Sequence, residues 1–172
     1  SSDDANHGLT IVTPNDHYGT VAFSDGSGGT SQGLLEYNHS GDYFRVYTAA
    51  SERFRIDSSG RIGVGVVPTA QYAHNLIQIG HQATLGANAA LSATGQTFLT
   101  HNLYFDTGGT FRVFNTSNAN EGAIFRLVDG QLLFSNSAAT TGTPTVTERF
   151  RITSDGNITF GHTSTSLAVT SA

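Results

Sequence analysis

A motif of fourteen residues, Glu52-Arg53-Phe54-Arg55-Ile56-Asp57-Ser58-Ser59-Gly60-Arg61-Ile62-Gly63-Val64-Gly65, occurs twice in this sequence. The second copy is Glu148-Arg149-Phe150-Arg151-Ile152-Thr153-Ser154-Asp155-Gly156-Asn157-Ile158-Thr159-Phe160-Gly161, and nine of the fourteen positions are identical. In the first copy, Phe54 and Ile56 alternate with Arg53, Arg55 and Asp57, which is the two-residue period of a β-strand with one apolar side. Each copy therefore predicts a strand, a tight turn and a second strand.

The turn of the motif determines which residues face each other. Ser58-Ser59-Gly60 suits a three-residue loop closed by a glycine in the left-handed region. The cross-strand pairs that follow are Asp57–Arg61, Ile56–Ile62 and Phe54–Val64 in the first copy, and Ile152–Ile158 and Phe150–Phe160 in the second. Apolar residues meet apolar residues across both hairpins, and such a pattern fixes the register.

The string E-R-F-R-I-D-S-S-G-R-I-G-V-G resembles the repeat of bacteriophage tail-fibre shafts, which is common upstream of the self-cleaving chaperone domain of endosialidase-type fibres. Residues 8–68 resemble one whole unit of this kind. They contain Phe23-Ser24-Asp25-Gly26, Leu35-Glu36-Tyr37-Asn38-His39-Ser40 and Phe44-Arg45-Val46 before the hairpin. That family usually carries Met where Phe54 and Phe150 stand here. The resemblance implies an all-β fibre of short antiparallel hairpins that assembles as an elongated homotrimer.

The spacing of landmarks divides the chain into two repeats, residues 1–68 and a longer one over residues 69–172. Phe44-Arg45-Val46 recurs as Phe111-Arg112-Val113, but this offset is shorter than the offset between the two copies of the motif. The second repeat therefore contains an inserted hairpin. Two alignments satisfy the spacing: the insertion is either the hairpin around Asp129-Gly130 or the one around Phe111.

The remaining elements are predicted from alternation and turn residues. Expected strands are 9–12, 19–23, 33–37, 43–47, 75–79, 98–105, 110–114, 124–128 and 131–134. The last two pair across Asp129-Gly130, which is a strong signal for a two-residue turn of type I′. Residues 83–93 are rich in alanine and are expected to form a helical turn.

Composition limits the classes of function. Charged residues make up 12% of the chain, the net charge is −5, and all eight basic residues are arginines. A mildly acidic chain without a basic stripe argues against nucleic-acid binding, and no apolar run is long enough to span a bilayer. Seven of the arginines adjoin a phenylalanine and follow the strand alternation, so they are interpreted as architectural. Cysteine is absent, which excludes disulfides and thiolate metal sites.

No catalytic, cofactor-binding or metal-binding residue is assigned. A glycosidase needs two converging carboxylates; the candidates Asp25, Glu36, Asp42 and Asp106 mostly fall in predicted turns, where Asp serves the backbone. The seven histidines lack the close spacing of a metal motif; they are His7, His17, His39, His74, His81, His101 and His162. Tyr18, Tyr37, Asn38, Tyr43 and Tyr72 could line a sugar site, but packing is the favoured interpretation.

We therefore expect a non-enzymatic structural protein of the virion surface, assembled in the bacterial cytoplasm, namely a tail fibre for host attachment. Isolated hairpins are marginally stable, and identical copies can bury a repeated apolar face around a common axis. In that trimer Phe54 and Phe150 face the core between subunits. Expected partners are other virion proteins and a host surface glycan or envelope receptor. The alternatives are a capsid-surface fibre or decoration protein, a polysaccharide-degrading spike fragment and a bacterial adhesin repeat.

Overall fold

The computed structural model describes residues 8–26, 32–71, 74–88, 95–117 and 120–161. These residues form β-strands and turns and contain no helix, so the all-β prediction is confirmed. The strands are β1 (Tyr18–Phe23), β2 (Gly33–Asn38), β3 (Tyr43–Thr48), β4 (Ser51–Ile56), β5 (Ile62–Val64), β6 (His74–Ile79), β7 (Ala83–Asn88), β8 (Gln96–His101), β9 (Leu103–Phe105), β10 (Phe111–Val113), β11 (Asn120–Val128), β12 (Gln131–Thr140), β13 (Val146–Ile152) and β14 (Ile158–Phe160).

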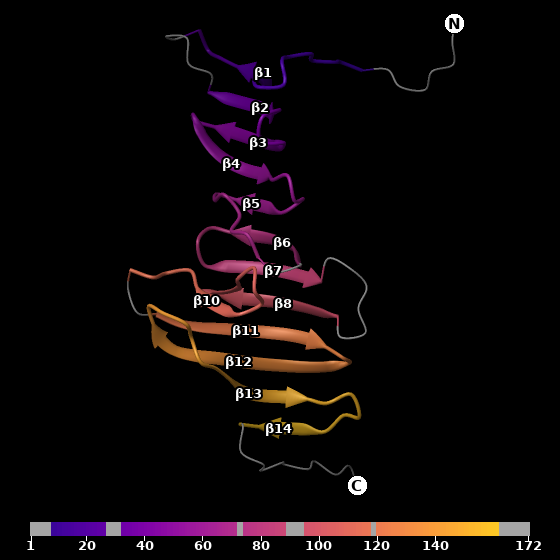
Figure 1. Cartoon of the computed structure of the whole chain (residues 1–172), viewed down its shortest axis with the longest axis vertical. Coiled ribbons are helices and arrows are strands. Elements are labelled where there is room, and N and C mark those ends of the chain that lie inside the picture. Colours follow the sequence, from indigo (N-terminus) through magenta and orange to yellow (C-terminus); the bar gives the residue numbers. More distant parts are fainter. Residues whose placement is uncertain (1–7, 27–31, 72–73, 89–94, 118–119, 162–172) are drawn as a thin grey trace, which may run out of the picture.

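Twelve strands form one open sheet in the order β1-β2-β3-β4-β5-β6-β7-β8-β11-β12-β13-β14. Chain order and spatial order agree except that β9 and β10 leave the sheet and pair with each other. Figure 1 shows the strands stacked one after another along the long axis, with β1 at one end and β14 at the other. All neighbouring strands are antiparallel except β5 and β6, which are parallel. The antiparallel hairpins were predicted from the sequence, and the parallel contact was not.

Both copies of the motif form the predicted hairpin. All five predicted cross-strand pairs are present: Ile56–Ile62, Phe54–Val64, Ile152–Ile158 and Phe150–Phe160 in the strand registers, and Asp57–Arg61, whose backbone groups bond at 3.0 Å. Gly60 and Gly156 close the two turns at φ +76° and φ +86°, a backbone conformation that glycine adopts without steric cost. The local sequence therefore determines this unit of structure.

A β-bulge at the same position in each copy was not predicted. Next to the Val46–Phe54 pair the register shifts, so that Arg53 is the extra residue. Arg149 is the extra residue next to the Phe134–Phe150 pair. A bulge re-aims side chains. Arg53 and Arg149 therefore no longer point to the face of the sheet opposite to that of the phenylalanine that follows each of them. This corrects the simple alternation expected for Arg53 and Arg149.

The strand pairing can be compared with the two alignments of the second repeat. Strands β11, β12 and β13 pair in the same order and in the same register as strands β2, β3 and β4. The turn between β11 and β12 has Asp129 at φ +52° and Gly130 at φ +71°, as the type I′ prediction requires. This comparison favours the alignment in which the hairpin β9–β10 around Phe111 is the insertion.

The insertion encloses the main apolar core. Its members are Phe98, Leu103, Phe105, Val113 and Ile124, and each is at most 7% exposed. The chain leaves the sheet at Asn102, which has φ +52° and is fully buried. The Asn102 side chain donates to the Glu121 carbonyl at 3.1 Å and accepts from the Asn115 amide at 3.0 Å. This buried amide ends the strand that the sequence predicted to run without a break over residues 98–105.

Two local predictions are wrong. Residues 9–12 form no strand; β1, the outermost strand of the sheet, pairs with β2 alone. The helical turn expected over residues 83–93 is replaced by β7 (Ala83–Asn88), which pairs with both β6 and β8. Pairing on two sides outweighs the modest helix propensity of a short alanine-rich stretch. Residues 89–93 of that prediction lie outside the described residues.

Candidate assembly surface

The strand registers place an unbroken line of apolar side chains along one side of the sheet. Residues that are directly opposite each other on paired strands share a face. Followed from β2 to β14, this line is Tyr37, Phe44, Ile56, Ile62, Ile77, Leu85, Leu99, Phe125, Phe134, Phe150 and Phe160. We call this side of the sheet the apolar face.

Further lines of apolar residues flank the first on the same face. At the N-terminal end they are Val21, Leu35, Val46, Phe54, Val64 and Ile79. At the C-terminal end they are Leu127, Leu132, Ile152 and Ile158. The apolar face therefore extends over both repeats and over the strands that join them.

This face is open in the single chain. Leu99 is 54% exposed, Ile79 56% and Phe160 52%. Ile56, which would be a central core residue in a self-contained domain, is 37% exposed. A contiguous exposed apolar patch much larger than a few hundred Å² marks an interaction surface in soluble proteins.

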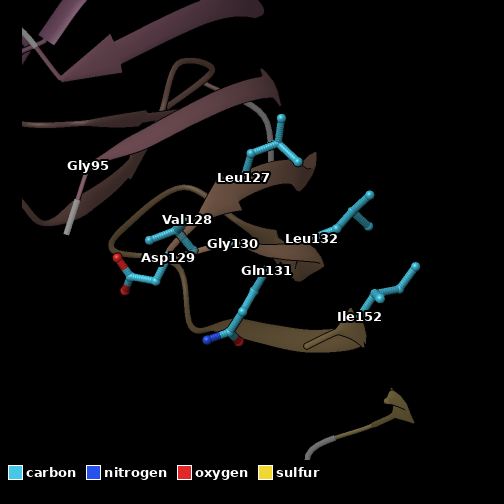
Figure 2. Close-up of a pocket in the computed structure, with 8 residues that line it drawn as sticks. All are labelled: Gly95, Leu127, Val128, Asp129, Gly130, Gln131, Leu132 and Ile152. Carbon is cyan, nitrogen blue, oxygen red and sulfur yellow. The ribbon is translucent and has the colours of Figure 1, made fainter. Parts of the chain in front are cut away.

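Figure 2 shows one end of the apolar face, at the turn between β11 and β12. Leu127, Leu132 and Ile152 project to one side of the strands, and Asp129 and Gln131 to the other. An open hollow of about 410 Å³ lies at this turn. A second hollow of about 360 Å³ lies on the apolar face over β5 to β8, where the small residues Ala87 and Thr97 stand beside Ile62 and Leu85.

The opposite face of the first repeat carries a network of charges. Arg45 donates through Nε to Glu36 at 2.5 Å and lies 3.7 Å from Glu52. Arg55 donates to both carboxylate oxygens of Glu52, at 2.7 and 2.6 Å. These hydrogen bonds, led by the one from Arg55, hold the pKa of Glu52 below its ordinary value, and burial opposes them. Arg55 also lies over the ring of Tyr43, 4.0 Å from its centroid.

Three ion pairs of the repeated motif lie in partly buried positions. Besides Arg55–Glu52, Arg61 pairs with Asp57 at 2.7 Å and Arg151 with Glu148 at 2.5 Å. Their side chains are only about one eighth to one third exposed. Partial burial reduces solvent screening, so these pairs contribute more than fully exposed ones.

The sequence candidates for catalysis have structural partners. Glu36 belongs to the charge network, and Asp42 accepts from the Tyr37 hydroxyl at 3.2 Å. Asp106 accepts from the amides of Gly108 and Thr110 and from Arg112, which together hold its pKa below the ordinary value. Asp25 lies in the turn after β1. These contacts agree with the turn and packing roles expected from the sequence.

In the described part of the chain no three His, Asp or Glu side chains gather as a metal site would require. His7, His162 and Tyr72 lie outside the described residues, as does the side chain of His74. Tyr18 and Tyr43 lie against Arg45 on the face opposite to the apolar face. Their ring centroids are 5.0 and 5.3 Å from Arg45 Cζ, which is the packing role preferred above.

Comparison of the chain with protein-family models, curated proteins and solved structures finds no match. Within the described ranges, no helix has the length and apolarity that crossing a membrane demands.

Proposed function

We propose that this chain is a structural segment of a bacteriophage virion fibre, and that it assembles as a homotrimer through the apolar face. The observation that carries the proposal is the exposed apolar line that runs from β2 to β14 without a charged residue. Strands stacked along one axis, with β1 and β14 at opposite ends (Figure 1), give the elongated shape that a fibre needs.

Identical copies are the occupants that best explain the apolar face. The same apolar positions recur in both repeats, so the surface has one character along its whole length. Closed cyclic symmetry lets each copy cover the others with the same surface. Burying one large apolar side chain contributes about 1.5–3 kcal/mol, and every level of the sheet adds such a contribution from each chain.

The tail-fibre assignment is supported by the resemblance of the repeated motif to fibre-shaft repeats. It makes the chain a component of the particle surface that contacts other virion proteins and serves attachment to a host glycan or envelope receptor. The hydrogen-bonded carboxylates of Glu36, Asp42 and Asp106 support a binding and structural role over a polysaccharide-degrading one.

Sedimentation equilibrium tests the assembly. The intact chain at micromolar concentration should give three times the chain mass of 18.1 kDa. Leu99→Asp, which places a charge in the middle of the apolar face, should abolish that species, whereas Ser59→Asp in the exposed hairpin turn should not. A well-folded single subunit in the unchanged protein would refute the trimer.

Two further experiments separate the virion assignments. Antibody-labelled electron microscopy of intact particles should place the chain on the tail; labelling of the capsid would favour a decoration protein. Incubation with host envelope polysaccharide should release no oligosaccharide, and release of fragments would show the spike alternative to be correct.

A further inference from the structure

The charges on the face opposite to the apolar face differ between the repeats. When the two repeats are compared by their strand registers, Glu36 corresponds to Arg126, Arg45 to Leu133 and Arg55 to Arg151. In the first repeat, Arg45 neutralises Glu36. In the second repeat, Arg126 occupies the position of Glu36, and Leu133 occupies the position of Arg45.

Arg126 is left without a counter-ion. Within the described residues its side chain makes no ion pair, and its Nε atom is buried without a hydrogen-bond partner. Glu148 already binds Arg151 through both carboxylate oxygens, at 2.8 and 2.5 Å. Outside the described residues the sequence has acidic side chains only at Asp3 and Asp4.

The apolar surroundings of Arg126 disfavour its positive charge. The direct cross-strand neighbours of Arg126 are Phe98 and Leu133, which are 1% and 4% exposed. Burial lowers the pKa of Arg126 below its ordinary value, Arg151 adds to this effect, and Glu148 opposes it. A buried polar atom without a partner destabilises a fold and calls for a specific explanation.

We infer that Arg126 is the anchor of a binding site for the carboxylate of an acidic sugar, with Arg151 and Gln131 beside it. This inference rests on the host-attachment part of the proposed function, because a receptor glycan supplies the sugar. Arg126 as a whole is only partly buried, although its Nε atom is buried. Gln131 accepts a hydrogen bond from Arg151 at 2.7 Å, which fixes the second arginine next to the site.

The charge balance selects a carboxylate over a phosphate. Glu148 neutralises Arg151, so the site has one uncompensated positive charge. A carboxylate matches that charge and the planar fork of a guanidinium. A phosphate monoester carries about −1.5 to −2 at neutral pH, and its excess negative charge would be repelled by Glu148.

A ¹H–¹⁵N correlation NMR titration of the full chain tests the site, with the Nε–H signal of Arg126 as the reporter. Titration with glucuronate should shift this signal, with a dissociation constant on the order of 1 mM for a single sugar. Glucose should leave it unchanged, and glucose 6-phosphate should bind at least about tenfold more weakly than glucuronate. Equal binding of the phosphate, or no shift with glucuronate, overturns the inference.

Variants separate the site from general effects. Arg126→Gln should weaken glucuronate binding by roughly tenfold or more, because a charge-assisted hydrogen bond is lost. Arg55→Gln, in the first repeat where the counter-ion is present, should bind as the unchanged chain does. If Arg126→Gln binds glucuronate normally, or if it dissociates the trimer, then Arg126 serves another purpose and the inference fails. The sedimentation measurement on the same sample shows separately whether the fibre assembly itself is correct.

Discussion

The first repeat (β2 to β5) and its counterpart (β11 to β14) share one face of the sheet and differ on the other. On the apolar face, Leu35, Val46, Phe54 and Val64 correspond to Phe125, Phe134, Phe150 and Phe160. On the opposite face the first repeat has a closed charge network, whereas the second has the hairpin β9–β10 and Arg126, which makes no ion pair within the described residues. If the proposed assembly through the apolar face is correct, it constrains that face, while the other is free to diversify.

The largest expected effect tests the shared face. Phe54→Ala and Phe150→Ala should each weaken the trimer and cost about 3–5 kcal/mol for each side chain removed from a buried site. Because the two residues occupy equivalent positions, the two losses should be similar. Thermal melting together with sedimentation measures both. Unchanged mass and melting temperature in either variant would show that the corresponding phenylalanine does not face an interface.

The second prediction tests a feature that only the second repeat has. Leu103 is fully buried under the insertion, so Leu103→Ala should cost about 2–5 kcal/mol, measured by denaturant unfolding. Gly122→Ala should also destabilise, because the new Cβ would lie 2.4 Å from Leu103 Cγ. Combining the two changes should cost less than the sum of the single changes, since the smaller side chain makes room. Strict additivity would contradict this packing.

The third prediction concerns the unequal charges. Arg126→Met should raise the stability of the protein by about 1–4 kcal/mol, because an unpaired charge is replaced by an apolar side chain of similar length. The matched change Arg55→Met should lower stability, because it leaves Glu52 without its main partner. Melting curves of the two variants should therefore shift in opposite directions. A loss of stability in Arg126→Met would show that its charge is compensated.

The smallest effect is a pH dependence of the first repeat. The pKa of Glu52 lies below its ordinary value of 4.5, chiefly because of the hydrogen bonds from Arg55. A lowered pKa in the folded state stabilises the fold above pH 4.5, and this contribution is lost as the pH falls through the lowered value. The loss should be about 1 kcal/mol. Melting between about pH 6 and pH 3 should show it in the unchanged chain and not in Glu52→Gln.

The sequence predicts this structure best where contacts are local. The register of both motif hairpins follows from Gly60, Gly156 and the alternation around them. The Asp129-Gly130 turn is equally local, since both residues have the positive φ that their types favour. Residues that pair within about ten positions of each other leave a pattern that can be read directly.

Features that depend on distant contacts were not predictable. The parallel contact of β5 with β6 leaves no periodic signal, because both strands alternate as antiparallel strands do. Asn102 ends β8 through partners at Asn115 and Glu121, which no local pattern announces. The solitary charge of Arg126 became visible only when the register showed that Leu133 faces it. Its neighbour Phe125 made it look like the architectural arginines.

The direction of the strands has a mechanical consequence. In Figure 1 they lie across the long axis, so the backbone hydrogen bonds between them point along it. A pull from the two ends loads these bonds one rung at a time, as in unzipping, rather than shearing many together. Twelve strands spaced by roughly 4.8 Å cover about 50 Å. Separation of one pair of strands would let such a sheet lengthen. In the proposed trimer, resistance to tension would therefore come from side chains packed between neighbouring chains.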